Sequence, residues 1–164
     1  MINTQFLNAS PLFRDLDPLE RAQVLMIGQI RSFGAEDVLF REGDAGDGLF
    51  IVISGSIRIS KRSLTGEEAL AVLEPNAFFG EMALIDYSNR AADAIANEKS
   101  EAFFIPLKEL RDLIEAHPPI AIKVLYALCE VLTQRLRETN ERYMNIFTIA
   151  QWGGGLQSGL VPLP

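Results

Sequence analysis

The sequence predicts an α+β fold, mainly β, in which a series of short strands is flanked by helices. Near the start of the chain, apolar residues recur at helical spacing after Asp17. From Ile30 to Pro106 the pattern changes to short runs of β-branched and aromatic residues separated by Gly, Asp, Asn and Ser, which is typical of strands joined by turns. After Pro106 the helical spacing returns. These observations predict a β-barrel between helices without determining its strand order.

Length and composition are those of a single globular domain. The chain has 164 residues, of which 48% are hydrophobic and 23% charged, and a domain of this size can bury one substantial core. No apolar run approaches the ~18 residues of a membrane span, and Met1–Ser10 lacks the features of an export signal. The net charge of −7 repels a polyanion. We therefore expect a cytoplasmic protein that binds neither membranes nor nucleic acid directly.

Metal-binding side chains are scarce. Cys129 is the single cysteine and His117 the single histidine, so neither a thiolate zinc site nor a histidine-carboxylate site can be assembled. We expect Cys129 to be a small core residue and His117, directly before two prolines, to mark the entry to a helix. A Ser-His-Asp relay would have to be built around His117 alone. We therefore predict no metal, no cofactor and no catalytic residue.

The elements follow in order along the chain. The first helix begins at Pro18, directly after the N-cap residue Asp17. The predicted strands are Val38–Phe40, Leu49–Ile53, Ile57–Ser60, Ala69–Leu73, Arg90–Ala96 and Ala102–Pro106. Ser54, Gly55 and Ser56 are predicted to join the second and third of these strands as a tight hairpin. A short amphipathic helix then ends before His117.

The last helix is predicted from Pro119 to about Asn145. Because Ile120–Leu132 carries only two charged residues, we expect this helix to be buried on more than one side. One stripe at helical spacing comprises Ile120, Val124, Ala127 and Val131, and a second, close to a heptad seam, comprises Leu125, Leu128, Leu132, Leu136 and Thr139. Arg135, Arg137 and Arg142 are interpreted as part of a solvated face. Residues 146–164 are expected to form a poorly ordered tail.

The most informative stretch is Phe78–Ala92, FFGEMALIDYSNRAA. Gly80 permits a close turn, and the helix formers after it begin a short helix whose free N–H groups attract an anion. Arg90, nine residues after Glu81, is expected to open the next strand, where its guanidinium can bind a phosphate through two hydrogen bonds. The stretch therefore predicts an anion site.

This turn, acid, short helix and arginine closely resemble the phosphate-binding cassette of the cyclic nucleotide-binding domain family, which includes catabolite activators, kinase regulatory subunits and gated channels. Arg41–Phe50 is similar to the family's glycine and aspartate turn, and the resemblance covers Leu12–Tyr143. It implies an eight-stranded jelly-roll β-barrel with one N-terminal helix and two C-terminal helices. The implied domain is 12–145, with 119–145 as the lid or dimer helix.

For function, the resemblance implies binding of a 3′,5′-cyclic nucleotide inside the barrel. The implied ligand-binding residues are Gly80, Glu81, Met82, Ala83, Arg90 and Ala91, and the implied purine cap is Leu132, Arg135 and Leu136. Arg90 would bind the phosphate, Glu81 would accept from the ribose 2′-hydroxyl, and Gly80, Ala83 and Ala91 would present backbone N–H groups. Cyclic AMP is expected over cyclic GMP, because Ala91 stands where relatives selective for cyclic GMP often have Thr.

Some features depart from the family pattern or allow another interpretation. Tyr87 adds bulk to the loop, and Asn89 stands where many members have proline, but neither change removes a ligand group. Glu81 and Arg90 could instead form a structural ion pair. The Gly43–Gly48 turn is assigned no ligand role, since a calcium loop needs more oxygen ligands.

Three classes of function are therefore compared. The first is a receptor, not an enzyme, that signals through its C-terminal helix to an effector protein, through a homodimer, or as the sensor domain of a larger regulator. The 21 residues after Tyr143 are too few for a helix-turn-helix module. The second class is a structural or protein-interaction barrel without a ligand. The third, a cupin-like metalloenzyme, lacks the required metal-binding side chains.

Overall fold

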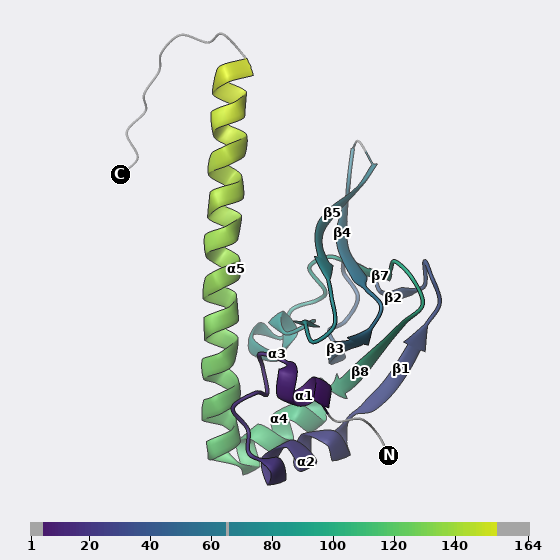
Figure 1. Ribbon diagram of the computed structural model, residues 1–164, viewed down its shortest axis with the longest axis vertical. Coiled ribbons are helices and arrows are strands. Elements are labelled where there is room, and N and C mark those ends of the chain that lie inside the picture. The colour runs from purple at the N-terminus through teal and green to yellow at the C-terminus, as the bar shows by residue number, and fades with distance from the viewer. Residues whose placement is uncertain (1–4, 65, 154–164) are drawn as a thin grey trace. The chain divides into compact units, whose positions relative to one another are not determined.

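The structure, a computed structural model, describes residues 5–64 and 66–153. Contacts divide the chain into two compact units, Met1–Leu128 and Cys129–Pro164. The described part of the first unit contains eight strands, which form two four-stranded antiparallel sheets (Figure 1). The strands are β1 (Gln29–Phe33), β2 (Val38–Phe40), β3 (Gly48–Ser54), β4 (Ile57–Ser63), β5 (Gly66–Leu73), β6 (Phe78–Phe79), β7 (Asp93–Ala96) and β8 (Ser100–Pro106). The helices are α1 (Gln5–Ala9), α2 (Pro18–Ile27), α3 (Met82–Asp86), α4 (Leu107–Ala116) and α5 (Pro118–Gly153).

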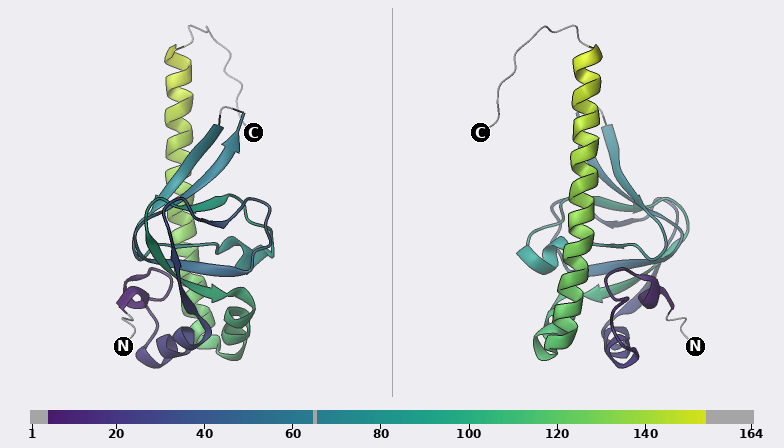
Figure 2. Two further views of the ribbon diagram at one scale, coloured as in Figure 1. Left: turned by 90° about the vertical axis from the view of Figure 1, so that its right-hand side faces the viewer. Right: turned by 60° about the vertical axis from the view of Figure 1, so that its left-hand side comes forward.

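The strand order is that of a jelly roll. One sheet has the order β1-β8-β3-β6 and the other the order β2-β7-β4-β5. Sequential strands therefore alternate between the sheets in most places, and the two sheets enclose a common interior (Figure 2). The fold is thus mixed α+β and mainly β, with the barrel that was expected.

Aromatic side chains fill the interior between the sheets. Phe50 on β3 stacks on Phe79 of β6 with ring centroids 5.0 Å apart, and Phe104 of β8 meets Phe50 at 4.9 Å. The remaining core residues around them are Val52, Ile57, Ala94, Ala96 and Ala102. Small alanines on β7 and β8 leave room for the rings, since interiors pack close to crystal density.

The predicted hairpin at Ser54–Ser56 is wrong. The segment is a tight turn, with Gly55 at φ +75°, but β3 pairs with β6 and β8 whereas β4 pairs with β5 and β7. The turn is therefore a corner at which the chain passes from one sheet to the other. The hairpin partner of β4 is β5, with Ile57 opposite Leu73.

Helix α2, at one end of the barrel, begins where the sequence predicts it. Asp17 accepts from the N–H groups of Leu19 and Glu20 at 2.8 and 2.9 Å, and the Glu20 carboxylate accepts from the Asp17 N–H at 2.7 Å, which is a complete capping box for α2. Figure 1 shows α1, α2 and α4 together at this end. The short α1 was not predicted, because five residues are too few for a periodic signal.

The last helix is longer and less buried than predicted. α5 continues past Asn145 to Gly153, and the rest of the expected tail lies outside the described residues. In its first turns one side is buried, at Ile120, Val124, Ala127 and Leu128. The opposite side, at Ile122, Leu125 and Tyr126, is exposed, so the expectation of burial on more than one side is wrong for this single chain.

Cys129 is exposed and is not the core residue that was expected. It directly follows the buried Leu128, and helical geometry turns successive positions toward different sides of a helix. Among the described residues, no helix has both the length and the hydropathy required to cross a bilayer.

Candidate functional site

Gly80 lies between β6 and α3, and its position excludes a side chain. Its φ is +80°, and a Cβ atom there would lie 2.5 Å from Nη1 of Arg90 and 2.9 Å from the carbonyl oxygen of Gly48. L residues adopt such a φ at a cost, and both neighbours are fixed by the fold. Glycine at this position is therefore required by the close approach of Arg90.

Arg90 is the central side chain of the site, and it is 5% exposed. Its Nη2 donates to Oδ1 of Asp47 at 2.8 Å and to the carbonyl oxygen of Gly48 at 2.7 Å, while Nη1 donates to the carbonyl oxygen of Gly80 at 3.2 Å. The guanidinium also lies over the ring of Phe40, 4.1 Å from the centroid. The ring of Phe40 and the three oxygen acceptors thus fix the orientation of the guanidinium.

The prediction that Arg90 opens a strand is wrong, because β7 begins at Asp93. The backbone N–H of Arg90 donates to the carbonyl of Asp44 at 2.8 Å, and its carbonyl accepts from Gly43 at 2.9 Å. The residue is therefore paired with the Gly43–Gly48 turn rather than with a neighbouring strand. This pairing holds the guanidinium beside Gly80.

The charges around Arg90 are acidic. Burial lowers the pKa of the Arg90 guanidinium, and its hydrogen bond to Asp47 opposes that change, as do the charges of Asp47, Asp44 and Glu81. Arginine side chains stay protonated in proteins at neutral pH. Glu81 is itself buried, at 5% exposure. A buried cation and a buried acid therefore lie at the start of α3.

Arg90 forms an ion pair with Asp47, whose side chain is 65% exposed. The Gly43–Gly48 turn, to which the sequence assigned no ligand role, thus supplies a structural partner for Arg90. The turn's run of two aspartates between glycines was a usable signal, since a buried arginine needs an acidic partner. Phe40 was also missed, because a strand phenylalanine carries no signal beyond the core.

The other predicted site residues lie around this centre in different environments. Ala83 is buried and packs against the glycine turn, where a Cβ on Gly46 would lie 2.2 Å from that of Ala83. Met82 is 51% exposed, and Ala91 is also exposed. The residues predicted as the purine cap are Leu132, Arg135 and Leu136. They belong to the second unit, so their role stays a prediction.

The fold is a jelly-roll domain in which a buried arginine, a glycine turn and a buried carboxylate lie close together. The sequence pattern of the family described as "Cyclic nucleotide-binding domain" matches residues 30–117. The chain belongs to this family. Within the described residues, no cluster of three or more His, Cys, Asp or Glu side chains could hold a metal ion.

Similar proteins come from bacteria and from a eukaryotic parasite. A curated relative, "Cyclic AMP receptor protein" of Thermus thermophilus, is 36% identical over 82% of this chain and 61% of its own length. A cyclic nucleotide-binding domain from Methylobacillus flagellatus has a TM-score of 0.77 at 25% identity, covering 96% of this chain and 84% of that one. The regulatory domain of Toxoplasma gondii PKA with cAMP has a TM-score of 0.63 at 30% identity, covering 67% and 42%. The chain spans about three fifths of the length of the first curated relatives.

Proposed function

We propose that this chain is a receptor for a 3′,5′-cyclic nucleotide, with cyclic AMP as its ligand, and that it regulates a partner instead of catalysing a reaction. The observation that carries the proposal is the buried guanidinium of Arg90 beside Gly80, with the buried Glu81 next in the chain. Membership of the cyclic nucleotide-binding domain family and the name of the Thermus relative support it.

The ligand chemistry matches these two side chains. A 3′,5′-cyclic phosphodiester carries one negative charge and its ribose retains one free hydroxyl. Arg90 would bind the phosphate and Glu81 would accept a hydrogen bond from the 2′-hydroxyl. Gly80, Met82, Ala83 and Ala91 would contribute backbone and van der Waals contacts around them. This division of roles selects a cyclic ribonucleotide over a linear one or a deoxyribonucleotide.

Asp47 balances the charge of Arg90. Its exposed carboxylate is paired with an arginine side chain that is 2% exposed, so an anion already neutralises the buried cation. A ligand phosphate would approach from the side of the guanidinium that Asp47 does not occupy, or replace Asp47 there. Either arrangement keeps Arg90 paired in both states.

Titration calorimetry with cyclic AMP and cyclic GMP tests the proposal directly. We expect tighter binding of cyclic AMP, since Ala91 has no side-chain group for guanine. The variant Ala91→Thr should raise the affinity for cyclic GMP by about tenfold, the value of one net hydrogen bond of ~1.5 kcal/mol. Ala91→Val has the same shape without the hydroxyl and should not raise it. Tighter binding of cyclic GMP by the parent protein would contradict the assignment.

The α5 helix is proposed as both the lid over the purine and the surface for a second copy or an effector. In the Cys129–Gly153 part, exposed apolar side chains continue the heptad spacing at Leu132, Leu136, Tyr143 and Ile146. Leu128, predicted for this seam, is instead buried in the first unit. The greater length of the relatives also supports a further domain as the receiver of the signal.

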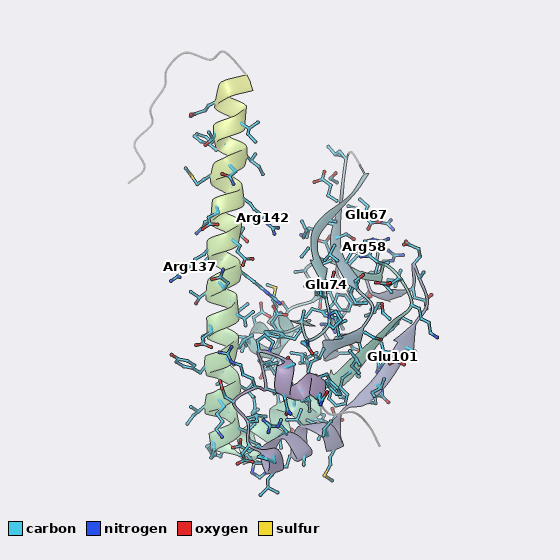
Figure 3. All side chains as sticks on the ribbon, in the orientation of Figure 1. Arg58, Glu67, Glu74, Glu101, Arg137 and Arg142 are labelled. Atoms are coloured by element: carbon cyan, nitrogen blue, oxygen red, sulfur yellow. The ribbon has the colours of Figure 1, made fainter. Side chains whose placement is uncertain are left out.

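Truncation after Glu130 should therefore leave the phosphate site but weaken cyclic AMP binding and abolish self-association. Sedimentation velocity and calorimetry measure both effects. As a matched pair in the full chain, Leu136→Glu on the seam should reduce self-association, whereas Arg137→Glu, one residue off the seam, should not. Figure 3 labels Arg137 on α5. An unchanged affinity and an unchanged oligomeric state after truncation would show that the helix is neither lid nor interface.

A further inference from the structure

Arg111, in the second turn of α4, contacts the segment that follows Glu81 from outside the site. Its Nη2 donates to the carbonyl oxygen of Ala83 and, at 3.4 Å, to that of Leu84. Its guanidinium carbon lies 3.8 Å from the ring centroid of Tyr87. Arg111 of α4 therefore contacts two backbone carbonyls of α3 and Tyr87, the residue at which α3 ends.

These contacts add to the few hydrogen bonds that a helix as short as α3 can form within itself. A helix of five residues cannot satisfy its own last carbonyls, and helices far shorter than ~12 residues are not stable in isolation. Tyr87, the C-cap, has φ +57°. A non-glycine residue in this region keeps its conformation only where its surroundings determine it. Arg111 supplies these surroundings through its contacts with the carbonyls of Ala83 and Leu84 and with the ring of Tyr87.

The cost of placing Arg111 there argues against a purely structural role. Its Nε is buried and has no hydrogen-bond partner among the described residues. A buried, unpaired donor is unfavourable, and an apolar side chain could fill the same space without it. The positive charge of Arg111 lies where its Nη2 donates to backbone carbonyls of α3, next to the predicted phosphate loop.

The position of α3 also determines how the predicted phosphate loop meets Arg90. Ala83 packs on Gly46, where even a methyl group would collide, and Gly46 precedes Asp47, the partner of Arg90. A small shift of α3 would therefore alter both the backbone at Gly80 and the pairing of Arg90, because close-packed contacts transmit displacement.

We propose that Arg111 is a positioning residue for cyclic nucleotide binding: it clamps the end of α3 and its left-handed cap, and so keeps the loop before it in the geometry that the phosphate requires. The inference rests on the proposed function, because its first test measures the affinity for cyclic AMP. Arg111 belongs to α4, which packs against α2 and β8, so the clamp joins the loop to the helices and the sheet of the first unit.

The test uses the full chain with Arg111→Ala, Arg111→Lys and the control Lys108→Ala. Lys108 is on the same helix but pairs with Asp112 on the exposed side. Calorimetry with cyclic AMP should show a loss of about tenfold to a hundredfold for Arg111→Ala, the value of a charge-assisted hydrogen bond. Arg111→Lys keeps the positive charge and should lose less cyclic AMP affinity than Arg111→Ala. Lys108→Ala should bind as the parent does.

Amide hydrogen exchange of residues 82–88 provides a second readout that needs no ligand. Arg111→Ala should accelerate exchange there and leave β3 and β8 unchanged. Parent affinity in Arg111→Ala, even with a lower unfolding midpoint, would overturn the inference. If the parent binds neither cyclic nucleotide, the proposed function fails, and the exchange data alone decide: unchanged protection of residues 82–88 refutes the clamp. Should Arg111→Ala not fold, Arg111→Lys carries both measurements, with a loss of affinity and faster exchange expected.

Discussion

Replacing Arg90 with alanine should weaken cyclic AMP binding by about two to three orders of magnitude. The variant removes the positive charge that the phosphate would meet in a buried site, and loss of one partner of a buried charge pair costs about 3–5 kcal/mol, where about 1.4 kcal/mol is a factor of ten. Titration calorimetry below the unfolding transition measures the change. Glu81→Ala should have a smaller effect of about 1.5–3 kcal/mol, because it removes one hydrogen bond to a charged group.

The matched control for Arg90→Ala is Arg58→Ala. Arg58 is another ion-paired arginine, with Glu36 at 2.7 Å and Glu67 at 2.9 Å, but it lies on the β4–β5 side of the barrel (Figure 3). We expect it to change stability slightly and affinity not at all. Equal affinity for cyclic AMP in the Arg90→Ala variant and the parent would show that the site is assigned to the wrong residue.

Gly80→Ala should be nearly as damaging to binding, although it removes no ligand group. The added methyl would lie 2.5 Å from Nη1 of Arg90 at a φ of +80°. The guanidinium must then move, and most of its charge-assisted interaction with a phosphate, about 1.5–3 kcal/mol, depends on its position. The expected loss is a factor of roughly 10 to 150 in affinity, measured by the same titration.

Gly43→Ala separates backbone strain from displacement of Arg90. Gly43 has a similar φ of +87°, but a Cβ there meets nothing within 4 Å. Both variants should therefore lose about 1–2 kcal/mol of stability from the left-handed conformation, measured by urea unfolding. Only Gly80→Ala should also lose affinity. Equal affinities for the two variants would mean that the contact between Gly80 and Arg90 has no part in binding.

The features that the sequence predicted correctly are those encoded within a few residues. The capping box at Asp17 and Glu20 begins α2 at Pro18 as expected, because the donors and acceptors of a helix start lie three residues apart. The short helix after Gly80 and the amphipathic α4 follow from local composition in the same way. The motif around Glu81 and Arg90 was sufficient to indicate the family, and residues 30–117 match it.

The sequence could not predict which segments, far apart along the chain, pack or pair with one another. Ser54–Ser56 has the composition of a hairpin, and its identity as a corner depends on β3 pairing with β8 and β4 with β7. The exposure of Cys129 likewise depends on which stripe of α5 is buried by packing. Apolar residues at helical spacing show that a face can be buried, but not against what.

By itself, then, the sequence determined the mainly β fold and the order of most elements, and it predicted the residues of an anion site, since periodicity, capping and turn chemistry act over short separations. Only the tertiary structure decided how that site is held. Arg90 is paired with Asp47 at a separation of 43 residues, and α3 is held by Arg111 at a separation of 28. Such contacts depend on how the two sheets and α4 pack, and that packing is a property of the whole chain rather than of any segment of it.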